Sequence, residues 1–281
     1  MNESIFSTGK SAVITGAGLG IGRATAVDLA AKGMNVCLVD VLNDDLQETL
    51  ARAQKAASGA GVQSKAIAVS ADISKTKSWQ KIYKAVVDEF GELNLLMNNA
   101  VTRTAKGFDV PMDEWRQSFE TNFWSVVEGT NVLLPLLESS GVPSLKSRII
   151  NVGSKQGITN PPGHPIYNIA KSALKTYTEQ LEHDLRNRGE ATVSAHLLVP
   201  GWTTTGKNEH KKGAWLPEQV VERMIQSVDA GDFYIICPDD DVTEIMDRKR
   251  VFWGAGDITE NRPPLSRWHD EYKDVATKAC N

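Results

Sequence analysis

The fold of this chain is decided by residues 11–22, SAVITGAGLGIG, where a short apolar run leads into a glycine-rich turn. Residues 11–14 predict a buried strand, and the segment from Gly20 to Lys32 predicts a helix closed by Gly33. Glycines permit a tight turn and close backbone approach to a pyrophosphate, which the helix N-terminus attracts. Strand, turn and helix at the first crossover predict a dinucleotide site; the alternative is a loop whose glycines only turn the chain.

Apolar runs and helical segments alternate along the rest of the chain. We expect further strands at 35–39, 65–69, 93–97, 148–152, 192–199 and 233–236. We expect helices at about 43–58, 74–90, 112–137 and 165–188, and from 217 onward. Such alternation favours parallel strands joined by right-handed helical crossovers. The predicted fold is α/β, a doubly wound parallel sheet of about seven strands with helices on both faces.

Two stretches break the alternation. Residues 202–216, WTTTGKNEHKKGAWL, form an irregular excursion after the sixth strand. Residues from about Pro238 onward are polar, contain tryptophan and show no regular pattern. Because no linker or repeat is visible, we expect one domain over 1–281 with a C-terminal extension at about 238–281.

The composition excludes several classes of protein. A net charge of −4 provides no basic field for a phosphate backbone, so we expect no nucleic-acid partner. The apolar runs are far shorter than the ~20 residues of a membrane helix, and no signal-peptide pattern precedes them. We therefore expect a cytoplasmic protein with no membrane partner.

Cysteines and histidines suggest neither a disulfide frame nor a metal site. Cys37, Cys237 and Cys280 are odd in number and far apart. The first two lie in apolar, strand-like runs, where a buried thiol is expected. The five histidines are dispersed, without the spacing of metal ligands, and we expect no metal.

The stretch 151–171, NVGSKQGITNPPGHPIYNIAK, indicates acid–base chemistry. Tyr167 and Lys171 are four residues apart, so on a helix they share one face. A free phenol titrates near pH ~10, and a neighbouring cation stabilises its anion. Ser154, at the end of a strand, could hold the oxygen that is oxidised or reduced. The alternative is an ordinary helix whose Tyr and Lys face solvent.

Asp40 ends the second strand, eighteen residues after Gly22. A carboxylate there can accept both adenosine ribose hydroxyls and repels a 2′-phosphate. The glycine turn carries no Lys or Arg before Arg23, so we expect NAD rather than NADP. The alternative is a carboxylate that only caps a helix or a turn.

Together these motifs resemble the short-chain dehydrogenase/reductase family in its single-domain form. The matching residues, in order, are TGAGLGIG, Asp40, Asp72-Ile73, Asn98-Asn99-Ala100, Asn122, Ser154, YNIAK and Pro200-Gly201. The resemblance covers about residues 9–237. It implies an NAD(P)-dependent oxidoreductase that moves a hydride between nicotinamide and a secondary alcohol or ketone.

The resemblance also implies roles for single residues. Tyr167 is expected to be the general acid/base, and Lys171 to lower its pKa and bind the nicotinamide ribose. Ser154 would orient the substrate oxygen, and Asn122 would hold a water in a proton relay. Cofactor contacts are expected from Gly16, Gly18, Leu19, Gly20, Ile21, Gly22, Asp40, Asp72, Ile73, Asn99, Ala100, Tyr167, Lys171, Pro200, Gly201, Thr203 and Thr205.

Several of these residues have simpler explanations. Asn122 could bond the backbone within a helix, and Asp72 could cap the helix near Ser74. Thr205 could serve only its own loop. Val101 departs from the family pattern, which usually has glycine after NNA, and would narrow the space near the nicotinamide.

The 202–216 excursion resembles the substrate lid of the family. Trp202 and Trp215 could cover a flat or apolar substrate, or both could pack on the core. His164 is a further candidate substrate contact. So is Lys155, an unusual cation directly after Ser154, although we expect its side chain to point along the loop into solvent.

The expected partner is a small alcohol or carbonyl substrate, and the family usually forms dimers or tetramers through the helices at 112–137 and 165–188. We therefore expect a homodimer or homotetramer. Two other functions stay open: a catalytically silent dinucleotide-binding redox sensor, and a biosynthetic enzyme whose reaction is not simple redox.

Overall fold

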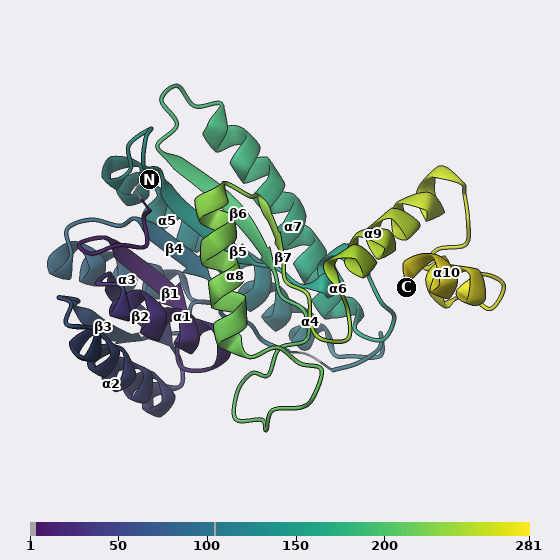
Figure 1. Cartoon of the computed structure of the whole chain (residues 1–281), viewed down its shortest axis with the longest axis horizontal. Coiled ribbons are helices and arrows are strands. Elements are labelled where there is room, and N and C mark those ends of the chain that lie inside the picture. Colours follow the sequence, from purple (N-terminus) through teal and green to yellow (C-terminus); the bar gives the residue numbers. More distant parts are fainter. Residues whose placement is uncertain (1–3, 104) are drawn as a thin grey trace.

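Seven strands form one parallel sheet in the order β3-β2-β1-β4-β5-β6-β7, as Figure 1 shows for the computed structural model. Residues 4–103 and 105–281 are described. The strands are β1 (Ser11–Thr15), β2 (Asn35–Asp40), β3 (Ala66–Ser70), β4 (Leu95–Asn98), β5 (Ser147–Val152), β6 (Val193–Val199) and β7 (Tyr234–Ile236). The predicted doubly wound α/β fold is confirmed, and every strand lies within a few residues of its expected place.

Helices cover both faces of this sheet. They are α1 (Gly20–Ala31), α2 (Asn43–Ala60), α3 (Thr76–Glu89), α4 (Met112–Phe119), α5 (Ser125–Ser140), α6 (Lys155–Thr159), α7 (Pro165–Arg186), α8 (Pro217–Ala230), α9 (Glu244–Thr259) and α10 (Lys273–Cys280). One apolar cluster joins the sheet to α1, α2 and α8, and a second joins it to α3, α5 and α7.

The alternation of side chains along β1 explains why the sheet has two apolar faces. Ala12 and Ile14 point into the first cluster, and Val13 between them points into the second. Successive residues of a strand face opposite sides, so a strand covered on both faces is apolar throughout. Burying one such side chain contributes about 1.5–3 kcal/mol, which makes the central strands the most firmly held part of the sheet.

The strand order reverses between β1 and β4, and this positions the site. In open parallel sheets, ligands bind at the carboxyl ends of the strands where the order changes direction. The glycine turn (residues 15–22) follows β1, and Asn98-Asn99-Ala100 lies at the end of β4. These two segments are therefore neighbours at the carboxyl edge.

The helix expected at 112–137 is interrupted. A π-helical turn at Glu120–Trp124 separates α4 from α5, and Asn122 lies within it. A π turn takes one more residue than an α-helical turn and is frequent at functional sites. The expectation of one continuous helix was wrong, because a single inserted residue leaves the apolar period on either side almost unchanged.

The C-terminal extension (residues 238–281) is helical, contrary to the expected irregular chain. The Thr243 side chain caps α9 by accepting the N–H of Met246 at 3.2 Å. Farther along, the Trp253 Nε1–H donates to the Ser266 hydroxyl at 2.7 Å. The helix α9 buries only Asp247 and has no apolar stripe, so it lacks the period by which helices are predicted. Figure 1 shows α9 and α10 projecting away from the sheet.

The cysteines, possible metal ligands and helix hydrophobicity can each be examined in the structure. Cys37 and Cys237 are buried free thiols, as expected, and Cys280 is also buried. In the described ranges, no group of three His, Cys, Asp or Glu side chains is arranged to hold a metal ion. Within the same ranges, every helix is too short or too polar to cross a membrane.

Candidate active site

The glycine turn leaves no room for side chains at its critical positions. Gly16 and Gly20 have φ angles of +65° and +55°, which favour glycine. A Cβ at Gly22 would overlap the carbonyl oxygen of Gly16 and would lie 2.6 Å from Asn99 Nδ2. The turn therefore keeps its backbone open toward the carboxyl edge, as close approach to a phosphate group requires.

The end of β4 holds the glycine turn in place. Thr15 Oγ1 accepts the backbone N–H groups of Asn99 and Ala100 at 2.9 and 3.1 Å. The Asn99 amide donates in return to the carbonyl oxygens of Thr15 at 2.9 Å and Gly16 at 3.2 Å. Asn99 and Ala100 thus contact the turn, as a cofactor-lining position requires.

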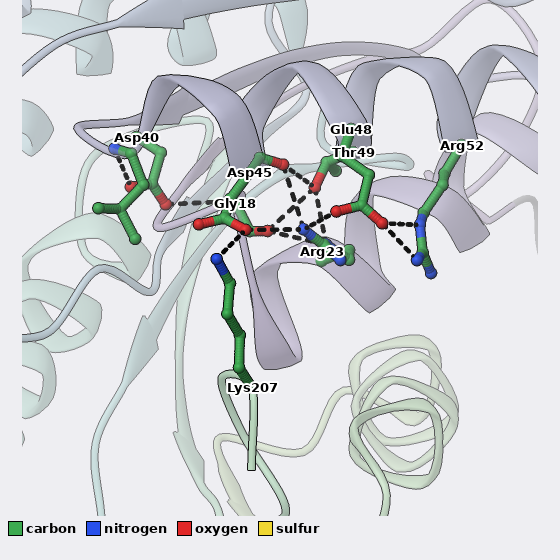
Figure 2. A network of polar contacts seen from close by, with 9 residues as sticks. Gly18, Arg23, Asp40, Asp45, Glu48, Thr49, Arg52 and Lys207 are labelled. Carbon is green, nitrogen blue, oxygen red and sulfur yellow. Dashed lines mark hydrogen bonds and ion pairs between the residues drawn. The ribbon is translucent and has the colours of Figure 1, made fainter. Parts of the chain in front are cut away.

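Asp40, at the end of β2, lies beside this turn. Its Oδ2 accepts the N–H of Gly18 at 2.8 Å, and its Oδ1 accepts the N–H of Leu42 at 2.9 Å. A Cβ on Gly18 would lie 2.9 Å from Oδ2, so a larger residue would press on the carboxylate. Figure 2 shows Asp40 and Gly18 joined in this way.

Arg23, the nearest cation in the sequence, is engaged elsewhere. Its Nε donates to the Gly18 carbonyl at 2.8 Å and to Thr49 Oγ1 at 3.0 Å. Its Nη2 lies 3.3 Å from Glu48 Oε2 and 3.7 Å from Asp45 Oδ1. Figure 2 shows the guanidinium within this network, on the α2 side of the turn.

The 202–216 loop crosses the glycine turn. Thr205 Cβ lies 3.2 Å from the position that a Cβ would take on Gly20. Lys207 Nζ lies 3.1 Å from Asp45 Oδ1, and its side chain remains 76% exposed. Figure 2 shows Lys207 reaching this carboxylate. The loop therefore touches the turn and the start of α2.

Ser154, Tyr167 and Lys171 converge beside the end of β5. Ser154 caps α6, and its Oγ accepts the N–H of Gln156 at 3.2 Å. Lys171 Nζ donates to the Val152 carbonyl at 2.7 Å and lies 5.8 Å from the centroid of the Tyr167 ring. The expected shared face of α7 is observed, and its Lys171 is buried, not solvated.

Burial controls the pKa values of both side chains. It raises the pKa of Tyr167, against the opposing effects of a hydrogen bond with Ser154 and the positive charge of Arg103. It lowers the pKa of Lys171 to about 8. The lowering of the Tyr167 pKa by Lys171, which the family resemblance implies, stays a prediction.

Asn122 is buried in the π turn and bonds the segment after β4. Its Oδ1 accepts the N–H of Thr102 at 3.2 Å, and its Nδ2 donates to the Thr102 carbonyl at 3.0 Å. The same amide donates to Ser118 Oγ at 3.1 Å. The side chain therefore fixes this segment, which leads from Ala100 through Val101 toward Arg103. Val101 itself is half exposed.

The remaining cofactor candidates lie near the carboxyl edge or in the core. Asp72 Oδ1 accepts the N–H of Ser74 at 3.0 Å, ahead of α3, and Ile73 is buried in the second apolar cluster. Leu19 precedes α1 in an extended conformation, and Ile21 is buried in the first cluster. Pro200 and Gly201 directly follow β6, and Thr203 Oγ1 donates to the Gly201 carbonyl at 3.1 Å.

The substrate candidates Trp202, Trp215 and His164 differ in burial and position. Trp215 packs partly buried against the first apolar cluster, whereas Trp202 is 47% exposed. The two residues join the ends of the loop, because the N–H of Trp215 donates to the Trp202 carbonyl at 2.8 Å. His164 directly precedes α7, beside Gly163, whose carbonyl accepts the N–H of Gly107 at 3.0 Å.

Lys155 does not point into solvent. Its Nζ lies 3.0 Å from Asp239 Oδ2 and 2.7 Å from Asp247 Oδ2, two carboxylates of the C-terminal extension. The expectation of a solvated side chain was wrong. Sequence reasoning also missed both aspartates and Arg103, because no spacing rule links these residues to positions far away in the chain.

Comparisons with known proteins agree with this geometry. The family model described as short chain dehydrogenase matches residues 10–214. SadH of Mycobacterium tuberculosis strain H37Rv, which is named as an oxidoreductase, is 37% identical over 180 residues, 63% of this chain and 61% of SadH. The chain thus spans less than two thirds of that relative. The 3-oxoacyl-(acyl-carrier-protein) reductase of Synechocystis sp. is 31% identical over 206 residues, 72% of this chain and 78% of the relative.

A solved structure resembles nearly the whole chain. It is a short-chain dehydrogenase/reductase from Burkholderia phymatum in complex with NAD, 29% identical, with a TM-score of 0.80. The match covers 93% of this chain and 98% of that one. An alcohol dehydrogenase from Thermococcus sibiricus, complexed with 5-hydroxy-NADP, is 24% identical and matches 78% of this chain and 90% of that one with a TM-score of 0.67, a likeness of fold.

Proposed function

Because the chain belongs to the short-chain dehydrogenase/reductase family, we propose that it moves a hydride between NAD(H) and a secondary alcohol or ketone. The observation that carries this proposal is the convergence of Ser154, Tyr167 and Lys171 at the carboxyl edge of the sheet. The glycine turn lies along the same edge, at the end of β1, so hydride chemistry and proton transfer would share one site.

The residues at the glycine turn fit a dinucleotide. The turn has no side chains at Gly16, Gly18, Gly20 and Gly22, and α1 begins there with free N–H groups. Asp40 would hold the adenosine ribose, and its negative charge disfavours a 2′-phosphate. Arg23 is paired with Glu48 and Asp45, so it is not free to neutralise such a phosphate. These observations support NAD(H) over NADP(H).

The bound nicotinamide would accept or supply the hydride, and side chains of the protein would transfer the proton. During oxidation, the phenolate of Tyr167 would take the proton of the substrate hydroxyl; during reduction, the phenol of Tyr167 would give its proton to the carbonyl oxygen. The Ser154 hydroxyl donates to the same substrate oxygen and stabilises its developing charge. Lys171 provides a positive charge one helical turn from Tyr167.

Two further features support this assignment. Asn122, buried in a π turn, fixes the chain that leads to the site, and we assign it the water of the proton relay. The 202–216 loop contacts the glycine turn through Thr205, so it can act as a lid that excludes water from the reacting atoms. Trp202 is the exposed aromatic residue available to cover a substrate.

We also propose that the enzyme is a homodimer or homotetramer. Trp124, next to α5, and Ile169, on α7, expose apolar surface on the helices that the family uses for assembly. Exposed apolar side chains of this size favour burial against a partner. Light scattering of the purified protein tests this assignment, and a monomeric mass would contradict it.

The main experiment follows NADH absorbance while a panel of secondary alcohols and ketones is supplied. Tyr167→Phe is expected to abolish turnover and to keep NADH binding, because only the proton-transfer oxygen is removed. Tyr177→Phe, ten residues later on α7, is the matched control. Unchanged turnover in Tyr167→Phe would overturn the assignment.

The same experiment separates the two alternatives. NADH binding without turnover of any tested substrate would favour the redox sensor. Turnover without net change in NADH would favour a reaction other than simple redox, which analysis of the bound product would identify. The complete set of Asn122, Ser154, Tyr167 and Lys171 speaks against the sensor, because cofactor binding alone does not need an acid/base group.

A further inference from the structure

The residue after Ser154 is held by the C-terminal extension. The ammonium of Lys155 lies between the carboxylates of Asp239 and Asp247, at 3.0 and 2.7 Å. The Lys155 side chain is 15% exposed, that of Asp239 4% and that of Asp247 1%. These three side chains form a buried ion cluster, one cation facing two anions.

The same cluster also holds the start of the 202–216 loop. Asp239 Oδ2 accepts the backbone N–H of Trp202 at 3.0 Å. Gly201, just before it, is packed so closely that a Cβ would lie 2.7 Å from Asp239 Oδ2 and 2.9 Å from Lys155 Nζ. The cluster therefore joins three segments: α6 beside Ser154, the entrance of the loop, and α9.

Burial of this kind is costly unless each charge keeps its partner. Two carboxylates close together repel each other; Lys155 is in contact with both, and the charge of Arg250 also acts on Asp247. Burial raises the pKa of Asp247, against the opposing charge of Lys155. A solvated lysine on a short helix would avoid this cost, so the cluster fixes geometry more than it adds stability.

We propose that Asp239 and Asp247 are positioning residues, which act through Lys155 to hold Ser154 and the entrance of the 202–216 loop in their reactive arrangement. The inference rests on the function proposed above. α6 has only five residues, Lys155–Thr159, and therefore few hydrogen bonds of its own to fix its first turn. The C-terminal extension is then a working part of the active site.

The cluster is tested with single and double variants. Asp247→Asn and Lys155→Met keep approximate shape but remove one charge each. Both should lower kcat on the order of tenfold or more, because a small displacement of a reacting group is enough for such a loss. The Kd for NADH should change less than kcat, because the glycine turn and Asp40 lie outside the cluster and only the loop's contacts with the cofactor would be weakened. The kcat of the double variant should fall no further than that of the more damaged single variant, because both changes break the same ion pair between Lys155 and Asp247.

The matched control is Glu244→Gln, also in the first turn of α9, whose ion pairs with Arg223 and Arg248 are partly solvated. It should leave kcat close to that of the wild type. Asp239→Asn is the second test variant if Asp247→Asn fails to fold. If the two cluster variants lower thermal stability but keep kcat, or if their losses in kcat add in the double variant, the positioning role is overturned.

Hydrogen exchange provides a readout that needs no turnover. Asp247→Asn should speed amide exchange in residues 153–159 and 201–206 and leave residues 15–22 unchanged. Faster exchange confined to the extension would contradict the proposal. If the wild type turns over no alcohol or ketone, the proposed function fails, and the exchange experiment still decides whether the cluster holds both segments.

Discussion

The backbone N–H of Gly18 donates to Oδ2 of Asp40 at 2.8 Å, which joins the end of β2 to the glycine turn. Asp40 Oδ1 accepts a second backbone N–H, from Leu42. A carboxylate offers about four lone-pair sites, so roughly one site on each oxygen remains for a ribose hydroxyl. The carboxylate can thus hold the turn through Gly18 and still accept hydrogen bonds from the ribose hydroxyls.

Asp40→Ser should erode the preference for NAD(H). Removing the negative charge ends its repulsion of a 2′-phosphate, and we expect the ratio of kcat/KM with NADH to that with NADPH to fall at least about tenfold. Steady-state kinetics with both nucleotides measure this ratio. Asp44→Ser, an exposed change in α2, is the control. A wild type that already prefers NADPH would show that the cofactor assignment is wrong.

Gly22→Ala should damage the cofactor site. The added methyl group would overlap the Gly16 carbonyl and press on the Asn99 amide, so the turn must shift. We expect NADH binding at least about tenfold weaker and a lower melting temperature, since overpacking costs about 1–3 kcal/mol. Fluorescence titration and thermal melting measure both effects. Gly59→Ala, with no atom within 4 Å of its new Cβ, should change neither for the worse.

Lys171 should leave a pH signature in stability. Its folded pKa of about 8 lies below the ordinary value of 10.5, so the native state releases its proton earlier than the unfolded state. The unfolded chain then binds more protons between pH 8 and 10.5, and the free energy of unfolding rises with pH in this window, by about 3 kcal/mol at most. Below pH 8 the cost of burying the charge is fully present.

Lys171→Met should therefore lack this rise, while losing turnover. Denaturant unfolding at pH 7, 8, 9 and 10 gives the free energy of unfolding of wild type and variant. Taking the difference between the two at each pH cancels the titration of other groups. Lys175→Met, one turn later on α7 and paired with Glu179 at 2.7 Å, should keep the rise. Equal pH dependence in wild type and Lys171→Met would refute the assigned burial effect.

His196 should contribute to acid sensitivity. Burial lowers its pKa from 6.5 to about 4, and its ring bonds the Asp232 carbonyl at 2.7 Å and the Ser194 hydroxyl at 3.1 Å. The unfolded chain takes up this proton below pH 6.5, whereas the native state resists it until about pH 4. Stability is thus lost as pH falls from 6.5 to 4, by about 3 kcal/mol at most.

His196→Gln should flatten that part of the stability profile, whatever its effect at neutral pH. Urea unfolding between pH 4 and 7 measures the slope. His183→Gln, an exposed change on α7, should keep the slope of the wild type. If the slope of His196→Gln equals that of the wild type, the histidine titrates normally in the folded chain.

Local patterns predicted most of the fold and the position of the glycine turn. Residues 11–14 are apolar throughout because β1 is covered on both faces, and Gly22 is required by a contact only six residues away. The four-residue spacing of Tyr167 and Lys171 likewise depends only on helix geometry. For Gly22, Tyr167 and Lys171 the physical cause lies within a few residues of the signal.

What could not be predicted depends on distant contacts. Lys155 is buried only because Asp239 and Asp247 return to it from the far end of the chain. The helix α9 begins with a threonine cap and packs through polar contacts, without an apolar stripe. The raised pKa of Tyr167 reflects burial, and the helical spacing of Lys171 says nothing about how deeply either side chain lies.

Asn99 has a consequence for the thermodynamics of cofactor binding. Its amide donates to the carbonyls of Thr15 and Gly16, so the glycine turn is held by the neighbouring strand through hydrogen bonds of the protein itself. Flexible glycine loops lose conformational entropy when they close around a ligand. A turn that is already fixed has little such freedom left to lose, so more of the contact energy with the pyrophosphate can appear as affinity.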